Sequence, residues 1–188
     1  MKELFAYFSQ FQKISKEVEN EIEAISSMIH VAKNNILQPF NHTCKTIYFL
    51  KQGIVRIYYL KDGIDITEGF YFENSMIARV ESLFTGKPTK KAIQVLQDAE
   101  IISINAKKLF NLYDKYPLVE RLFRKIFEAG YVETIHRMES IQFHSAEQRY
   151  KDLLLKTDIV KRIPLKYIAS YLGITQVSLS RIRAGINE

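Results

Sequence analysis

The sequence lacks the features on which disulfide-stabilised and membrane-spanning proteins depend. Its single cysteine, Cys44, excludes an internal disulfide framework and any cysteine-based zinc or iron–sulfur cluster within one chain. An apolar run of about 18 residues, which a transmembrane helix needs, is absent, and the residues after Met1 do not form the apolar core of a secretory signal. We therefore expect a cytoplasmic protein with no membrane partner.

Catalytic patterns are also missing. The chain contains neither a Gly-x-Ser-x-Gly nucleophile motif nor a phosphate-binding P-loop. Cys44 has only His42 as a reactive neighbour, which fits a buried cysteine better than a nucleophile. The histidines, none of which has the His-x-x-x-His spacing of a metal site, are His30, His42, His136 and His144. The sequence therefore predicts a protein that is not an enzyme and that holds no metal or cofactor.

What the sequence does contain is an unevenly distributed positive charge. The 188 residues carry a net charge of +6, and the segment from Ser145 to Glu188, with eight basic and four acidic residues, accounts for +4 of it. A basic segment favours an anionic partner. The C-terminal quarter of the chain is therefore the first place to look for a contact with nucleic acid.

The N-terminal residues have the spacing of helices. Leu4, Phe5 and Phe8 form a short apolar face, and Ser15 can act as the N-cap of a second helix. Apolar residues then recur at three and four positions as far as Ile29. We expect helix over residues 2–29.

From residue 30 to residue 104 the apolar period changes to two, which is typical of strands. Gly53 is expected to separate two strands, Asp62-Gly63 to form a hairpin turn, and Asn41 to adopt a positive φ in a turn. Strands are predicted at residues 30–37, 46–50, 54–60, 64–72, 93–96 and 100–104. Many short strands with tight turns indicate a β-roll of the jelly-roll type or a barrel.

Helical spacing returns after the strands. Asn105 can cap a short helix at residues 106–115, and residues 118–143 form the longest helical pattern, interrupted by Gly130. About 26 helical residues span roughly 39 Å, which is longer than a small domain needs. We predict a homodimer that pairs through helix 118–143. The alternative is a helix that packs on its own β-roll, and one apolar stripe could serve both purposes.

The chain next shows a break and a further helix. His144-Ser145 interrupts the long helix, and Ser145 with Gln148 forms a capping box for a helix that ends near Lys156. Further along the chain another short helix is expected, because Pro164 suits its first turn and Gly173 suits a left-handed C-cap at its end. We place a domain boundary at residues 143–145.

Residues 163–183 are typical of two short helices joined by a tight turn. Ile168, Ala169 and Leu172 repeat at helical spacing in the first helix, and Thr175 can cap the second, whose apolar face continues at Leu179. The other face of the second helix bears short hydrogen-bonding side chains and two arginines, with no acid. Such a surface suits the major groove of DNA. The alternative is a purely structural helical corner.

These residues resemble the helix-turn-helix of the Crp/Fnr family of bacterial transcription regulators. The resemblance rests on Ile168-Ala-Ser-Tyr-Leu-Gly-Ile-Thr175 and Ser178-Leu-Ser-Arg-Ile-Arg183, and it extends to Glu147-Gln-Arg-Tyr150 and Phe49-Leu-Lys-Gln-Gly-Ile-Val-Arg-Ile57. It implies an α+β fold with a cyclic-nucleotide-binding-type β-roll, flanking helices, a long dimer helix and a C-terminal helix-turn-helix domain.

The family's effector site is a Gly-Glu pair that opens a short helix, followed by Arg-Ser-Ala. In this chain Asn74-Ser75 and Lys90-Lys91-Ala92 occupy the corresponding places, with a short helix expected at about Met76–Thr85. One interpretation is a cationic effector pocket formed by Asn74, Ser75, Lys87, Lys90 and Lys91. The other, which we favour, is a solvated lysine-rich loop after Gly86. The conventional contacts of a cyclic nucleotide are therefore not expected.

Together these features predict a dimeric, sequence-specific DNA-binding transcription regulator. Residues 1–143 would form the sensory β-roll and dimer helix, and residues 144–188 the DNA-binding domain, with a small-molecule effector as a further partner. Thr157–Ile163 is too short for a full β-hairpin, so the wing that many such domains carry is reduced or absent. The predicted DNA-binding residues are Lys166, Thr175, Gln176, Val177, Ser178, Ser180, Arg181 and Arg183. The alternative function is a small-molecule-binding β-roll module whose helix-turn-helix no longer reads DNA.

Overall fold

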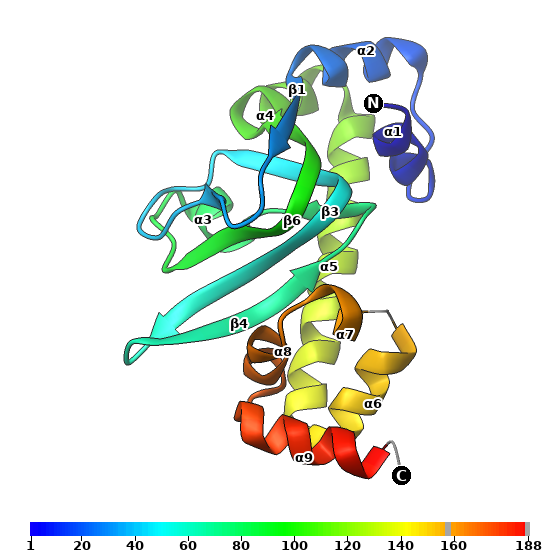
Figure 1. Cartoon of the computed structure of the whole chain (residues 1–188). Helices are drawn as coiled ribbons and strands as arrows, with labels where there is room; N and C mark the ends of the chain where they lie inside the picture. The colour runs from blue at the N-terminus through cyan, green and yellow to red at the C-terminus, as the bar shows by residue number, and fades with distance from the viewer. Residues whose placement is uncertain (157–158, 187–188) are drawn as a thin grey trace. The chain divides into compact units, whose positions relative to one another are not determined.

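The structure, a computed structural model, describes residues 1–156 and 159–186 (Figure 1). Its elements are α1 (Lys2–Ser9), α2 (Lys16–Ala24), β1 (Ser26–Val31), β2 (Ile36–Gln38), β3 (Thr46–Lys61), β4 (Ile64–Tyr71), β5 (Ser75–Ile77), α3 (Val80–Thr85), β6 (Lys91–Asn105), α4 (Ala106–Lys115), α5 (Pro117–Phe143), α6 (Ala146–Lys156), α7 (Ile159–Arg162), α8 (Leu165–Leu172) and α9 (Gln176–Ile186). The predicted α+β class, with a strand-rich region, a long helix and C-terminal helices, is confirmed.

The chain divides into two compact units. The first comprises Met1–Ile57 and Phe70–Ala129, and the second comprises Tyr58–Gly69 and Gly130–Glu188. The predicted break in the long helix is confirmed, because α5 ends at Phe143 and α6 begins at Ala146. The division into domains at residues 143–145 stays a prediction.

The strands form one sheet in the order β1-β6-β3-β4, with β2 added on β6 and β5 added on β3. β1 and β6 are antiparallel, from Ser26 opposite Ile104 to Val31 opposite Ala99. A sheet of this kind buries one apolar face of each strand, and the resulting core includes Val55, Ile57 and Ile93, none of which is exposed.

Two predicted helix boundaries near the sheet were wrong, for one physical reason. Residues 26–29 were expected to be helical but begin β1, Met76 and Ile77 were expected to open a helix but form β5, and the short helix α3 starts only at Val80. In each case the backbone pairs with a distant strand: β1 with β6, and Tyr48 of β3 with Ile77 of β5. Long-range pairing of this kind overrides local helical spacing.

Two strands are longer than predicted. β3 continues through Gly53, and β6 continues through Gln97 and Asp98, where turns were expected. Gly53 has a φ of +109°, and a Cβ atom built on it would lie 2.8 Å from both the Cβ of Ala99 and the carbonyl oxygen of Asp98. Glycine is therefore required at this position both by its backbone conformation and by the close approach of β6.

The predicted turns at Asn41 and at Asp62-Gly63 are confirmed. Asn41 has a φ of 60°, while Asp62 and Gly63 have φ values of 52° and 78°. Two consecutive positive φ angles define a type I′ hairpin turn, which matches the twist of the flanking strands. This turn joins β3 to β4.

Helices α1, α2 and α4 and the first half of α5 gather at one end of the sheet (Figure 1). Leu4 and Phe8 of α1 and Ile22 of α2 are completely buried, and the ring of Phe8 lies edge-on to that of Phe123 at 5.4 Å. The predicted caps are confirmed: the Val18 N–H donates to Ser15 Oγ at 3.4 Å, and the Lys108 N–H donates to Asn105 Oδ1 at 3.0 Å. The first half of α5 therefore belongs to the core of its own unit.

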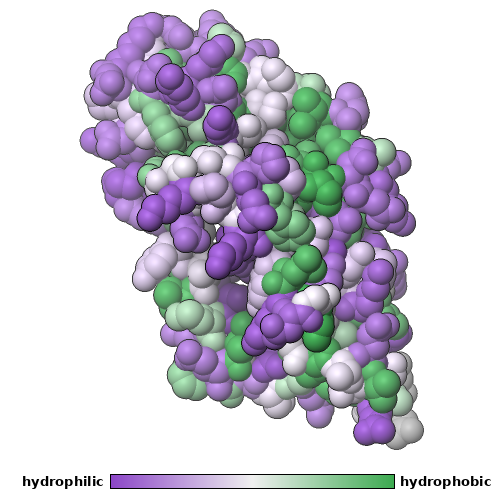
Figure 2. Space-filling model, turned by 90° about the vertical axis from the view of Figure 1, so that its left-hand side faces the viewer, coloured by the Kyte–Doolittle hydropathy of each residue, from purple (hydrophilic) through white to green (hydrophobic). Residues whose placement is uncertain are grey.

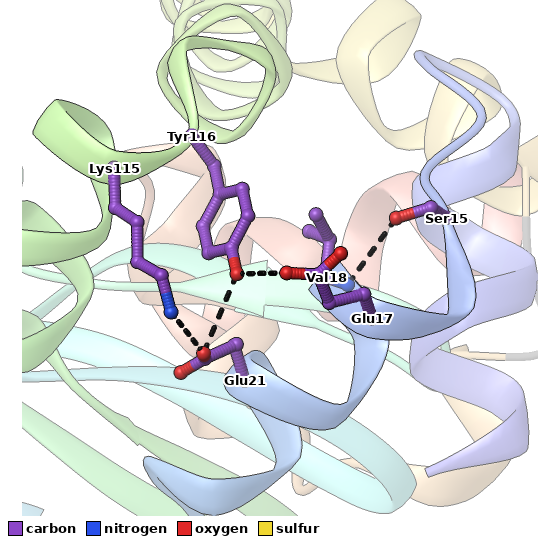
Figure 3. A network of polar contacts seen from close by, with 6 residues as sticks. All are labelled: Ser15, Glu17, Val18, Glu21, Lys115 and Tyr116. Carbon is purple, nitrogen blue, oxygen red and sulfur yellow. Dashed lines mark hydrogen bonds and ion pairs between the residues drawn. The ribbon is translucent and has the colours of Figure 1, made fainter.

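A polar network joins α2 to the junction of α4 and α5 (Figure 3). Lys115 Nζ lies 2.5 Å from Glu21 Oε1, and the Tyr116 hydroxyl donates to Glu17 at 2.6 Å and to Glu21 at 3.4 Å. The hydrogen bond and charge of Lys115, helped by the Tyr116 hydroxyl, lower the pKa of Glu21 below its ordinary value of 4.5. The network ties the N-terminal helices to the rest of the first unit.

The Lys115→Gln variant should have a lower melting temperature than wild type at pH 7, and this difference should shrink towards pH 3. A carboxyl with a lowered pKa stabilises the folded state above its unfolded pKa, and this contribution is lost as the pH falls through the folded pKa. The effect should be small because both side chains are partly exposed. Thermal unfolding followed by circular dichroism measures it, with the exposed Lys107 on the same helix, changed to glutamine, as control. An equal difference at both pH values would contradict this account.

The second half of α5 differs from the first in that it exposes apolar side chains. Val119, Leu122 and Phe123 are completely buried, whereas beyond Gly130 the side chains of Tyr131 and Met138 are 68% and 50% exposed. On one face of the molecule, Figure 2 shows hydrophobic residues, in green, reaching the surface among hydrophilic ones. The apolar stripe of α5 is therefore buried in the core of the first unit only along the first half of the helix.

Candidate nucleic-acid interface

Helices α8 and α9 are joined by a tight turn whose hydrogen bonds are made by the residues predicted from sequence. Gly173 has a φ of +71° and closes α8, and the Ile174 N–H donates to the carbonyl oxygen of Ala169 at 3.0 Å. Thr175 Oγ1 accepts the N–H of Ser178 at 3.1 Å and so caps α9. Pro164 precedes α8 as its N-cap, one position earlier than predicted.

One face of the helix pair is buried. Ile168, Ala169 and Leu172 of α8 and Leu179 of α9 are at most 1% exposed. Ala169 is small at the position where the two helices approach each other, which allows close packing. Tyr150 and Leu153 of α6 are also buried in this unit. Most of the predicted apolar positions are thus confirmed as buried, whereas Ile182 of α9 is only partly buried and Leu154 of α6 is 38% exposed.

The opposite face of α9 is directed to solvent. Gln176, Val177, Ser180 and Arg181 are exposed, and Val177 is 63% exposed although it is apolar. Helix α9, with the sequence QVSLSRIRAGI, contains no acidic residue. These four residues therefore present hydrogen-bond donors and acceptors, a methyl surface and a guanidinium on one side of a helix.

The other predicted DNA-binding residues differ in their environment. Thr175 and Lys166 are exposed, whereas Ser178 and Arg183 are partly buried. The hydroxyls of Ser178 and Thr175 are 3.0 Å apart, so the hydroxyl that caps α9 also bonds to that of Ser178. Thr175 can therefore bind a phosphate only with the hydrogen-bonding capacity of its hydroxyl that the cap does not use.

Helix α6 starts as predicted but without a reciprocal capping box. The Gln148 N–H donates to Ser145 Oγ at 3.2 Å, while the Gln148 side chain donates to Asp152 at 3.0 Å. Part of the segment Thr157–Ile163 lies outside the described residues, as do residues 187–188, and the remainder includes the short helix α7. Within residues 159–186 the backbone is helical or in turns and holds no strand of a wing.

Ser170 is a residue to which sequence reasoning gave no role. Its hydroxyl accepts the N–H of Thr67 at 2.8 Å and donates to the carbonyl oxygen of Asp65 at 3.0 Å. Because Asp65 and Thr67 belong to β4, the hydroxyl occupies the place that a neighbouring strand would take at the edge of the sheet. A cavity of about 600 Å³ adjoins this contact and is lined in part by Lys166, Thr175 and Gln176. No local sequence signal announces a contact across more than a hundred residues.

The residues predicted for an effector site lie in the first unit. Asn74 has a φ of 64° and its N–H donates to the carbonyl oxygen of Leu50, and Ser75 pairs with Leu50 in the sheet. Lys87 and Lys90 are exposed and Lys91 is partly buried. Because α3 begins at Val80, the residue that opens it is the buried Arg79 rather than Ser75, which sequence spacing did not reveal. The effector site therefore stays a prediction.

Neither a metal site nor a membrane segment emerges from the described part of the chain. Within residues 1–156 and 159–186, no cluster of three or more histidine, cysteine, aspartate or glutamate side chains could hold a metal ion. Among the same residues, every helix is too short or too polar to cross a bilayer.

One part of the chain matches a known protein family. Residues 28–116 match the family described as the cyclic nucleotide-binding domain. No match was found among the curated proteins. The segment matched corresponds to the strand-rich part of the chain and the helix α4 that follows it.

Solved structures of bacterial regulators are similar over most of the chain. FixK2 from Bradyrhizobium japonicum has a TM-score of 0.76 at 17% identity, covering 87% of this chain and 85% of that one. CLP from Xanthomonas campestris, described as a c-di-GMP-responsive global regulator, has a TM-score of 0.73 at 14% identity, covering 92% of each chain. A protein from Eubacterium rectale described as a Crp/Fnr-family regulator has a TM-score of 0.75 at 19% identity, covering 95% and 85%. Residues 28–116 are therefore similar to the cyclic nucleotide-binding domain, and most of the chain has the fold of these regulator structures.

Proposed function

We propose that the chain is a sequence-specific DNA-binding transcription regulator that acts as a cytoplasmic homodimer. The observation that carries this proposal is the face of α9, where Gln176, Val177, Ser180 and Arg181 are exposed together on a helix without acids. The similarity of fold to structures described as regulators supports it. The alternative, a small-molecule-binding module with a vestigial helix-turn-helix, has no observation in its favour beyond the reduced wing.

The four exposed residues suit contacts with base edges in the major groove. Arg181 can bind the O6 and N7 atoms of guanine with two hydrogen bonds, Gln176 can do the same with adenine, and Val177 can contact a thymine methyl group. Ser180 can bind either type of edge. Lys166, Thr175 and Arg183 would meet phosphates and fix the register of the helix on the duplex.

A homodimer would give the binding energy and symmetry that one helix pair lacks. We propose that two chains pair through α5, whose second half leaves Tyr131 and Met138 exposed. Two α9 helices related by a two-fold axis would read a palindrome with half-sites about 34 Å apart. The β-roll would then set this separation in response to an effector.

The Arg181→Ala variant should lose about 1–3 kcal/mol of binding free energy at the specific site and should discriminate less at one base pair of it. The reason is that two hydrogen bonds to a base edge are lost. Fluorescence anisotropy with matched and mutated duplexes measures both effects, and wild-type affinity should also fall steeply with salt.

The matched control is Arg124→Ala, which removes the same charge from an exposed position on α5. It should bind DNA like the wild type. Equal weakening in both variants, with discrimination unchanged, would mean that Arg181 contributes only general electrostatic attraction and would remove it from the base-reading set.

A further inference from the structure

A second cavity lies within the second unit, and its wall contains two positively charged side chains. Its volume is about 530 Å³, and it is lined by residues of the second half of α5, of α6 and by Tyr171 of α8. Two arginines, Arg137 and Arg149, line it together with the apolar side chains of Phe143 and Leu153. A pocket with apolar walls and a few convergent polar groups is the usual form of a small-molecule site.

The guanidinium of Arg137 lies over an aromatic ring. Its guanidinium carbon lies 3.7 Å from the centre of the Tyr171 ring, and one of its NH2 groups donates to the carbonyl oxygen of Tyr171. Burial lowers the pKa of Arg137 from its ordinary value, and the neighbouring charge of Arg149 lowers it further. Arg137 and Arg149 donate to the carbonyl oxygens of consecutive residues, Tyr171 and Leu172, so the two like charges lie near each other.

Arg149 bonds to the next carbonyl along α8. It donates to the carbonyl oxygens of Leu172, at 2.7 Å, and of His144, at 2.5 Å. The Nε atoms of Arg137 and Arg149 are both buried without a hydrogen-bond partner. Among the described residues neither guanidinium forms an ion pair, so both charges are met only by carbonyl groups and by the weak negative end of α8.

The acids around the cavity do not neutralise the arginines. Asp152 accepts a hydrogen bond from Gln148 at 3.0 Å and lies 3.4 Å from His144 Nδ1. Glu133 and Glu139 also line the cavity, but they are exposed and their charge is screened by solvent. Two partly buried cations side by side without a counter-ion are costly unless an anion joins them.

A dimer that pairs through Tyr131 and Met138 of α5 would leave the cavity open. On a helix with 3.6 residues per turn these two exposed residues lie roughly opposite Arg137 and Ser140, which line the cavity. Phe143, which is 76% exposed, lines the cavity itself and would have to lie outside such an interface.

We propose that this cavity is a binding site for a small anionic molecule, whose phosphate or carboxylate group is held by Arg137 and Arg149. Guanidinium groups bind both kinds of oxyanion with paired hydrogen bonds. The rest of such a molecule would lie against Phe143 and Leu153, and Ser140 supplies a further hydrogen-bonding group. The inference does not depend on DNA binding, because the site is built from side chains other than those on the exposed face of α9.

Thermal unfolding of the full chain in sodium phosphate, sodium acetate and sodium chloride at equal ionic strength tests the site. Phosphate or acetate should raise the melting temperature by a saturable amount beyond that of chloride, and the more effective salt identifies the group. The rise should disappear in Arg137→Gln and Arg149→Gln and persist in Lys90→Gln, which removes the same charge from the loop of the first unit. An equal rise in all variants, a rise lost only in Lys90→Gln, or no excess over chloride would overturn the proposal.

A second measurement avoids variants that fold poorly. In wild-type protein labelled with ¹⁵N-arginine, phosphate or acetate should shift the Nε–H signals of Arg137 and Arg149 saturably and leave that of the exposed Arg124 in place. Signals that move together in proportion to salt would contradict a built site. Both measurements are made without DNA, so their outcome is independent of the test of the proposed function.

Discussion

The Gly53→Ala variant is expected to unfold at markedly lower denaturant concentration than the wild type, with a loss of about 2–5 kcal/mol in the free energy of unfolding. An alanine at φ +109° is strained by roughly 1–2 kcal/mol. The added methyl group would also lie 2.8 Å from Ala99 and from the Asp98 carbonyl oxygen, and forcing apart a packed strand pair costs about 1–3 kcal/mol more. Because the obstacles include backbone of β6, no rotation of a side chain can relieve the overlap.

The comparison with Gly63→Ala isolates the effect of close approach. Gly63 also has a positive φ, +78°, but a Cβ atom there would meet nothing within 4 Å. This variant should lose only the conformational term, roughly 1–2 kcal/mol. Urea unfolding of both variants measures the difference, and equal losses would show that β3 and β6 can separate locally at no cost.

The Leu179→Ala variant is expected to destabilise the second unit by about 2–5 kcal/mol and to abolish DNA binding at ordinary protein concentrations. Leu179 is 1% exposed and is the only completely buried side chain among the described residues of α9. Removing it leaves a cavity between α8 and α9 and withdraws the contact that holds the exposed face of α9 in place.

Val177→Ala provides the control on the same helix. Val177 is 63% exposed, so its truncation should change the free energy of unfolding by no more than about 0.5 kcal/mol. Its effect should be confined to the preference for thymine at one position of the site. A large loss of stability in Val177→Ala, or none in Leu179→Ala, measured by denaturant unfolding, would mean that α9 packs by a different face.

Local signals in the sequence predicted local structure correctly. Ser15, Asn105, Ser145 and Thr175 each cap a helix in the structure, because a cap depends only on a side chain and an N–H three residues later. Gly173 ends α8 in the left-handed conformation for the same reason. Gly173 and Thr175 define the turn between α8 and α9, which is why the geometry of this helix pair could be predicted.

Features that depend on distant partners were predicted less well. Residues 26–29 have helical spacing, yet they form a strand because β6, more than seventy residues away, supplies the hydrogen bonds. The roles of Ser170 and Arg137 rest on contacts with Thr67 and Tyr171, which no local pattern announces. The candidate DNA-binding face could thus be predicted from periodicity, whereas the proposed anion site required the arrangement of three helices.

The most direct test of the proposed function is selection of bound duplexes from a random-sequence pool by the purified full chain, without added effector and then with phosphate or acetate present. We expect enrichment of a palindrome whose half-sites lie about one helical turn apart, with enrichment reduced in Arg181→Ala. A pool that stays random under all of these conditions, while the protein is folded and dimeric, would contradict the assignment of α9 as a DNA-reading helix and would favour a β-roll module without a DNA target.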